Sequence, residues 1–140
     1  MKSMLLHHIG LAVANLESQS ELYIKAFGYV ARTEIIHDPI QTAYVQFLRL
    51  PGDSVYLEFV APDGPRSKLT NAVNKGGGLN HLCYSTSDIE ATCQELRKTG
   101  LLLLQAPVPA AAFNMRRIAW MQGLDRVLIE LVERGKEGDL

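Results

Sequence analysis

The hydrophobic residues of this chain follow two kinds of spacing, alternation along short runs and helical spacing along two longer segments. Side chains of successive strand residues point to opposite faces, so alternation over about 4 to 8 residues predicts a strand that is buried on one face. Strands are therefore expected over residues 4–13, 29–36, 42–50, 54–60, 79–85, 101–105, 116–121 and 127–132.

Two segments carry hydrophobic residues at the spacing of one face of an α-helix. The first follows Asn15 and ends at Gly28, and the second follows Asp88 and ends at Gly100. Asn and Asp are good N-cap residues and Gly commonly ends a helix, so both segments have boundaries as well as periodicity. A shorter linking helix is expected over residues 67–74.

The order of these elements, a strand, a helix and three strands, occurs twice. We therefore expect a single domain over residues 1–140, with module one at 4–62, a linker at 63–77 and module two at 78–133. One such module has too few strands to bury both faces of its own sheet. The expected fold class is α+β: two βαβββ modules form one curved eight-stranded mixed sheet, with helices on the convex face and a cleft on the concave face.

The composition is that of a compact globular protein, with 47% hydrophobic and 21% charged residues. A net charge of −1 gives no field that would attract nucleic acid, and no apolar run approaches the roughly 20 residues of a membrane-spanning helix. No signal peptide is expected at the N-terminus. Cys83 and Cys93 are expected to be buried thiols, so we predict a cytoplasmic protein without nucleic-acid or membrane partners.

Two histidines and two glutamates fall on the same repeat as the elements. His81 follows His8 by 73 residues, and Glu130 follows Glu58 by 72 residues. Each glutamate lies inside an apolar strand, where a buried carboxylate is costly unless a cation neutralises it. Two modules paired about a pseudo-twofold axis would bring the four side chains to one point. We therefore predict one metal site formed by His8, Glu58, His81 and Glu130.

The ligand types indicate which metal the site would bind. Imidazole nitrogen and carboxylate oxygen suit a single divalent ion, with Zn, Co, Ni or Mn ahead of Fe(II). Two glutamates would neutralise the ion, and an octahedral arrangement would leave two positions for substrate oxygens. Taken singly, each of the four residues is better explained as an ordinary half-buried histidine or as one end of a surface ion pair. The matched spacing of all four favours the metal site.

Three further residues are candidates for substrate binding. Arg116 and Arg117 begin a predicted strand, and one of them should point into the cleft, where a guanidinium can hold a carboxylate or phosphate. The alternative is that both lie at a solvated hairpin end. Phe113 closes the apolar run PVPAAAF, which is either a lid over the cleft or a packed connection. His7 has the opposite parity to His8, so we expect it to have a structural role.

Several segments of the sequence resemble one known family. Similarity to the vicinal-oxygen-chelate (glyoxalase/bleomycin resistance/dioxygenase) superfamily is carried by HHIGLAVANLE, YLEFVAP, GGGLNHLCYSTSDIEA, RRIAWM and VLIELVE. Its methylmalonyl-CoA epimerase-like members are the most similar, with glyoxalase I next. The resemblance covers roughly residues 5–133 and implies the paired βαβββ fold and the same four metal ligands. Some epimerases carry a catalytic glutamate where this chain has Val45. The resemblance therefore implies that Val45 contacts the substrate, but a valine side chain cannot accept or donate a proton.

These observations favour a metal-dependent isomerase, epimerase or lyase, similar to methylmalonyl-CoA epimerase or glyoxalase. Such an enzyme removes a proton next to a carbonyl and stabilises the resulting enediolate with the metal. Because position 45 offers no acid or base, Glu130 or Glu58 is expected to be the catalytic base. The expected substrate is a small molecule such as a CoA thioester or a 2-oxo or 2-hydroxy acid.

Two other functions of the same superfamily stay open on the sequence. One is a non-catalytic small-molecule (drug) binding protein, and the other is an Fe(II) extradiol-type dioxygenase. The complete ligand set argues against the first. Glu58 as a fourth ligand argues against the second, because oxygen needs that position. Relatives commonly pair, so the resemblance also implies a homodimer.

Overall fold

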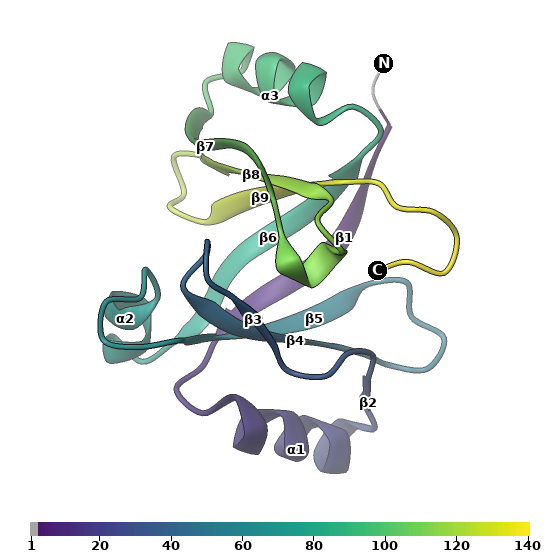
Figure 1. The fold of residues 1–140 in the computed structure, drawn as a ribbon, viewed down its shortest axis with the longest axis vertical. Helices are drawn as coiled ribbons and strands as arrows, with labels where there is room; N and C mark the ends of the chain where they lie inside the picture. The colour runs from purple at the N-terminus through teal and green to yellow at the C-terminus, as the bar shows by residue number, and fades with distance from the viewer. Residues whose placement is uncertain (1–2) are drawn as a thin grey trace. The chain divides into compact units, whose positions relative to one another are not determined.

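The computed structural model describes residues 3–140 and has an α+β fold (Figure 1). Within these residues there are nine strands: β1 (Met4–Ala12), β2 (Val30–Ala31), β3 (Ile36–Asp38), β4 (Ala43–Arg49), β5 (Tyr56–Pro62), β6 (Gly78–Thr86), β7 (Leu102–Pro109), β8 (Arg117–Gln122) and β9 (Leu128–Glu133). The helices are α1 (Leu16–Phe27), α2 (Thr70–Asn74) and α3 (Ile89–Lys98), with one 3-10 turn, η1 (Ala111–Phe113). None of the helices in this part of the chain is both long enough and apolar enough to cross a membrane.

The strands pair in the order β2-β4-β5-β1-β6-β9-β8-β7, and β3 pairs with β4. The pairs β1–β5 and β6–β9 are parallel, whereas β4–β5 and β8–β9 are antiparallel. The α+β class and the single mixed sheet are thereby confirmed. The order β1-β5-β4 in the first half matches β6-β9-β8 in the second, as the sequence repeat predicts.

The prediction of one strand over residues 29–36 is wrong, because this part of the chain forms two short strands, β2 and β3, with a break between them. At the break, the Thr33 hydroxyl accepts the backbone N–H of Phe47 at 3.1 Å, and the Gln46 side chain donates to the Thr33 carbonyl at 3.0 Å. Beside them the Arg32 N–H donates to the Phe47 carbonyl at 2.8 Å, so side-chain and backbone hydrogen bonds together join this segment to β4. The sheet of residues 3–140 therefore has nine strands rather than the expected eight.

Two compact units divide the chain. The His8 unit contains His8–Asn80, and the described part of the His81 unit contains residues 3–7 together with His81–Leu140. The boundaries between these units fall inside β1 and β6, so the units are groups of residues that pack together and differ from the modules of the sequence repeat. The modules at 4–62 and 78–133 stay a prediction.

In the His8 unit, α1 packs against one face of β4 and β5. The buried residues of this core are Leu16, Leu48, Phe59 and Ala61. The expected helix boundaries are confirmed: the Asn15 side chain accepts the Ser18 N–H at 3.0 Å, and Gly28 ends the helix at a φ of 80°. A left-handed φ of this kind is available to glycine without steric cost.

In the His81 unit, α3 packs against β7, β8 and β9. The buried residues of this core are Ile89, Cys93, Ala119, Met121 and Leu131. Asp88 caps the helix by accepting the Ala91 N–H at 3.1 Å, as expected. The following strand is longer than expected, because β7 continues through the prolines of PVPAAAF to Pro109. It is the last strand in the pairing order, and an edge strand tolerates proline because one side of its backbone needs no partner.

Candidate functional site

The first histidine–glutamate pair lies in the His8 unit. β1 and β5 run parallel with His8 opposite Tyr56, so Glu58, two residues further on, leaves β5 on the face that His8 occupies. His8 Nε2 and Glu58 Oε1 are 3.3 Å apart, and their side chains are 0% and 6% exposed. Both side chains point away from the helix-covered core, to which Phe59 belongs.

The second pair repeats this arrangement in the His81 unit. β6 and β9 are parallel with His81 opposite Leu128, and Glu130 again follows two residues later. His81 Nε2 and Glu130 Oε1 are also 3.3 Å apart, with side chains that are 2% and 4% exposed. The two pairs therefore occupy equivalent positions in their units, as the sequence repeat predicts.

Each pair also has an aromatic partner that sequence reasoning missed. The Phe47 ring meets the His8 ring edge to face at a centroid distance of 5.1 Å, and Phe47 lies opposite Glu58 in the β4–β5 ladder. Trp120 has the same relation to His81, with ring centroids 4.9 Å apart, and lies opposite Glu130. Trp120 follows Phe47 by 73 residues, so the repeat could have revealed both aromatic residues.

The geometry of each pair fits two neighbouring ligands of one metal ion. Two donor atoms that are each about 2.1 Å from an ion, at right angles to each other, lie about 3 Å apart. The observed separation in each unit is 3.3 Å between an imidazole nitrogen and a carboxylate oxygen. Nearly complete burial of a carboxylate also calls for a compensating positive charge. The donor set and its spacing therefore suit a divalent cation.

Val45 and Phe113 were expected to contact substrate. Val45 is buried in β4, opposite Val60, and shares the face of Phe47 in the His8 unit. Phe113 is buried in η1, where its ring meets the His7 ring edge to face at 5.5 Å. Their contact with substrate stays a prediction.

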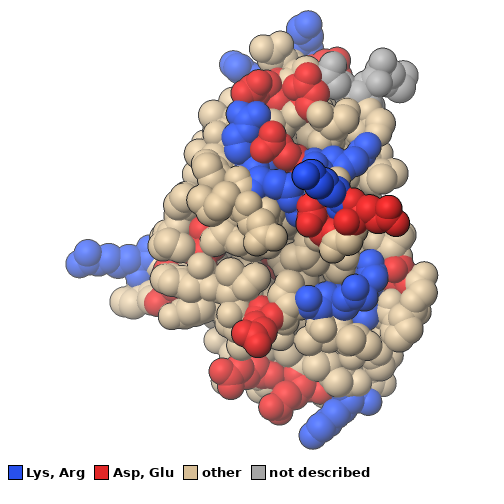
Figure 2. Space-filling view, turned by 45° about the vertical axis from the view of Figure 1, so that its right-hand side comes forward, with Lys and Arg blue, Asp and Glu red and all other residues tan. Residues whose placement is uncertain are grey.

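Arg116 and Arg117 hold parts of their own chain together. Arg117 donates to Glu90 at 2.7 Å and to Glu133 at 3.1 Å. Its hydrogen bond keeps the pKa of the Glu133 carboxyl below the usual value, and the same contact raises the pKa of Arg117. Arg116 donates to the backbone carbonyls of Phe113, Glu133 and Leu140. Their contact with substrate stays a prediction. On the face drawn in Figure 2, basic and acidic side chains are intermixed, in keeping with a net charge of −1.

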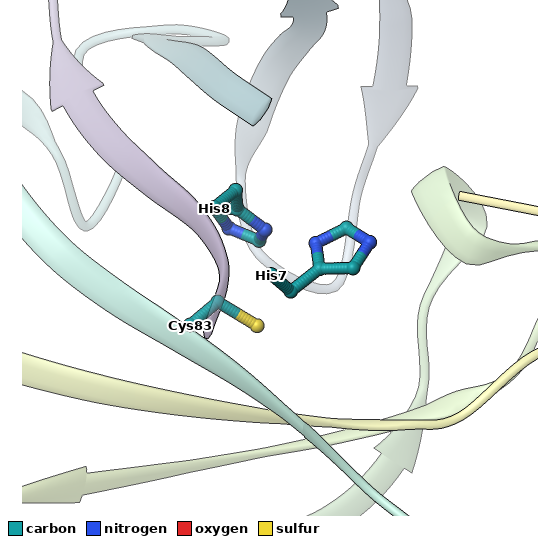
Figure 3. A group of neighbouring side chains, drawn as sticks. All are labelled: His7, His8 and Cys83. Atoms are coloured by element: carbon teal, nitrogen blue, oxygen red, sulfur yellow. The ribbon is translucent and has the colours of Figure 1, made fainter. Parts of the chain in front are cut away.

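A second imidazole and a thiol also lie on β1 and β6. His7 comes from β1, directly before His8, and Cys83 comes from β6 (Figure 3). His7 is half-buried, and its contact with Phe113 agrees with the expected structural role. Cys83 and Cys93 are both buried free thiols, as expected.

Comparison with known proteins gives consistent matches. The family model of the Glyoxalase/Bleomycin resistance protein/Dioxygenase superfamily matches residues 7–120. The mitochondrial methylmalonyl-CoA epimerase of Dictyostelium discoideum is 23% identical over 135 residues, which are 92% of this chain and 78% of that protein. The ethylmalonyl-CoA/methylmalonyl-CoA epimerase of Cereibacter sphaeroides is 27% identical over 123 residues, 86% of this chain and 89% of that protein.

A solved structure extends the match to the fold. The crystal structure of methylmalonyl-CoA epimerase from Mycobacterium tuberculosis superposes with a TM-score of 0.79 at 29% sequence identity. The superposition covers 94% of this chain and 89% of that one.

Proposed function

The chain belongs to the glyoxalase/bleomycin resistance protein/dioxygenase superfamily, and from this membership we propose that it is a metal-dependent epimerase. The observation that carries the proposal is the repeated histidine–glutamate pair, with the same 3.3 Å separation in both units. A non-catalytic binding protein has no need for two buried pairs of this kind. The named relatives, which are epimerases of acyl-CoA thioesters, support the same activity.

In this proposal His8, Glu58, His81 and Glu130 together hold one divalent ion. Their strands, β5, β1, β6 and β9, follow one another in the pairing order, and neighbouring strands lie about 4.8 Å apart. Two neutral imidazoles and two carboxylates balance the charge of a divalent ion, of which Zn, Co, Ni and Mn suit these donors. When bound, the ion would act as a Lewis acid towards substrate oxygens and make the neighbouring C–H more acidic.

The glutamates of the two pairs are the proposed proton carriers. Val45 is apolar, so the base must come from another position on this face. One glutamate, as a carboxylate in contact with the α C–H, removes the proton, and the other glutamate, after it takes a proton from solvent, returns that proton to the carbon. The first glutamate then releases its proton to solvent. Inversion results when the returned proton arrives on the opposite face of the planar carbon. Glu58 and Glu130 are the carboxylates we assign to these steps.

The proposed substrate is a CoA thioester with an acidic α-hydrogen, such as methylmalonyl-CoA. The test is incubation of the purified, metal-loaded protein with methylmalonyl-CoA in deuterated water, followed by mass spectrometry of the thioester. We expect one deuterium at the α-carbon, and loss of this exchange when a chelator removes the metal. Absence of exchange above the uncatalysed rate would overturn the epimerase assignment for this substrate.

We also propose that the protein is a cytoplasmic homodimer. The support is the resemblance to enzymes that commonly pair, together with a composition typical of a globular protein. Light scattering at micromolar concentration should give twice the 15.5 kDa chain mass. A mass that stays at one chain up to high concentration would contradict the dimer.

A further inference from the structure

One guanidinium group in the His8 unit lies on the same face as the His8–Glu58 pair. Arg49 ends β4 two residues after Phe47, so both side chains leave the same face of the strand. A series of contacts connects it to the pair. Arg49 Nη1 donates to Tyr56 Oη at 3.1 Å, and the Tyr56 ring centroid is 6.1 Å from that of Phe47. Phe47 in turn meets the His8 ring.

Tyr56 positions this guanidinium without neutralising it. Arg49 Cζ lies 4.8 Å from the centroid of the Tyr56 ring, and Tyr56 is only 7% exposed. A guanidinium has five N–H donors, of which the Tyr56 hydroxyl takes one. Within residues 3–140 no carboxylate lies within ion-pair distance of Arg49. Arg49 is half-buried and keeps its positive charge and most of its donors available.

The other two arginines considered for substrate binding differ in this respect. Arg117 is paired with two carboxylates, those of Glu90 and Glu133. Arg116 donates to three backbone carbonyls. Binding a substrate anion would require either of them to give up these contacts, whereas Arg49 has no ionic partner to lose.

Among residues 3–140, the position of the His81 unit that is equivalent to Arg49 carries no cation. In the β8–β9 ladder, Gln122 pairs with Leu128, next to the pair of Trp120 and Glu130. Gln122 and Leu128 are thus the equivalents of Arg49 and Tyr56, which lie next to Phe47 and Glu58. Both units therefore contain a histidine–glutamate pair, but only in the His8 unit is the strand residue two positions after the aromatic partner an arginine. An arrangement of this kind suits a substrate with one anionic group to recognise.

We propose that Arg49, held in place by Tyr56, binds an anionic oxygen group of the substrate. This inference rests on the proposed function and names the source of its substrate recognition. Arg49, Tyr56 and His8 lie in one row across β4, β5 and β1, so the Arg49 and His8 backbones are about 10 Å apart. A long arginine side chain reaches across most of that distance. The anion is either the free carboxylate of the acyl group or a phosphate of CoA, since a guanidinium binds both.

Three probes separate the two sources of the anion. Malonyl-CoA carries the carboxylate and the phosphates, propionyl-CoA lacks the carboxylate, and malonyl-pantetheine lacks the phosphates. Titration calorimetry measures the Kd of each probe for the wild type, Arg49→Gln and Arg49→Lys. Arg49→Gln introduces the residue found at the equivalent position of the other unit. Arg32→Gln is the matched control, because Arg32 is an exposed arginine of the same unit.

The expected result is that Arg49→Gln weakens malonyl-CoA binding about tenfold or more, the scale of a charged hydrogen bond, and leaves propionyl-CoA binding unchanged. Arg49→Lys should lose less, and Arg32→Gln should match the wild type. Weaker binding of both CoA thioesters with unchanged binding of malonyl-pantetheine identifies a phosphate as the anion. The metal content should be the same in all variants.

Two results would overturn the proposal: Arg49→Gln binds every probe as the wild type does, or the wild type binds none of them. If Arg49→Gln does not fold, Tyr56→Phe serves in its place, because it removes only the hydroxyl that holds the guanidinium. It should weaken the same probe about threefold, and unchanged binding would again overturn the proposal. Loss of the epimerase assignment is separable, because deuterium exchange can fail while the Arg49-dependent binding of malonyl-CoA persists.

Discussion

The His8 unit and the His81 unit contain the same buried histidine–glutamate pair, yet different side chains stand beside each pair. In both units the histidine nitrogen and the glutamate oxygen are 3.3 Å apart, and an aromatic ring meets the imidazole edge to face. Next to the first pair are Arg49 and Tyr56, joined by a hydrogen bond. The equivalent positions next to the second pair are Gln122 and Leu128.

This difference separates two requirements of the proposed enzyme. In the proposal the metal ion needs four ligands, so each copy of the repeat would have to contribute a histidine–glutamate pair. Recognition of one substrate anion is needed once, so a single copy is sufficient for it. The shared residues therefore indicate the reaction, and the residues that differ between the copies indicate the substrate.

The largest expected effect is on stability, in variants that compare Phe47, the aromatic partner of His8, with Trp120, the aromatic partner of His81. Phe47 is fully buried, whereas Trp120 is half-buried. Phe47→Ala should lower the free energy of unfolding by about 3–5 kcal/mol, the usual cost of removing a buried ring, and Trp120→Ala should cost less. Urea denaturation followed by circular dichroism measures both. A larger loss for Trp120→Ala would mean that burial does not decide the difference.

The next effect concerns the base, and it shows which unit supplies it. Glu130→Gln and Glu58→Gln each keep the shape and an oxygen ligand but remove the basicity. At least one of them should retain metal and lose solvent exchange at the substrate α-carbon by about 10²-fold or more, the scale of a general base. Glu21→Gln, at an exposed position on α1, is the control. Full exchange in both pair variants would mean that the base lies elsewhere.

The repeat, the helix caps and the positions of the pairs were predictable because they depend on local patterns. Asn15, Asp88 and Gly28 act within a few residues of their own helix ends. Strand alternation and a constant offset gave the two histidines, and the two glutamates, equivalent positions in the repeat. The structure adds that each glutamate lies beside the histidine of its own unit.

The remaining features depend on contacts between residues that are distant in sequence. At the break between β2 and β3 the Thr33 side chain bonds to β4, a contact that the sequence of that segment does not reveal. β7 passes through two prolines because it is an edge strand, a property of the whole sheet. The role proposed for Arg49 could not be predicted from the sequence, because an arginine at a strand end has no distinctive pattern and its contact with Tyr56 is a property of the fold.

The smallest effect comes from an ion pair that only the His81 unit has. The equivalents of Arg117 and Glu133 in the His8 unit are Tyr44 and Ala61, which carry no such charges. Glu133→Gln should lower the free energy of unfolding at neutral pH by less than about 1 kcal/mol, because both side chains are about a third exposed and solvent screens the pair.

This small effect should depend on pH in a defined direction. Arg117 lowers the pKa of Glu133 in the folded state, so the stabilisation is fully present above the unfolded value of about 4.3. It is lost as pH falls through the lower folded pKa, where wild type and Glu133→Gln should become equally stable. Glu137→Gln, an exposed neighbour on the C-terminal tail, should show no such pH dependence. A stability difference that persists at pH 2 would contradict this origin.

The central claim is that the two histidine–glutamate pairs act together on one ion, and metal stoichiometry tests it most directly. Elemental analysis of the purified protein should give about one divalent ion per chain. His8→Ala and His81→Ala should each weaken its binding by more than about 100-fold, although they remove ligands from different units. Two ions per chain would mean that each pair binds its own ion. Full metal retention in the His8→Ala/His81→Ala double variant would contradict the account altogether.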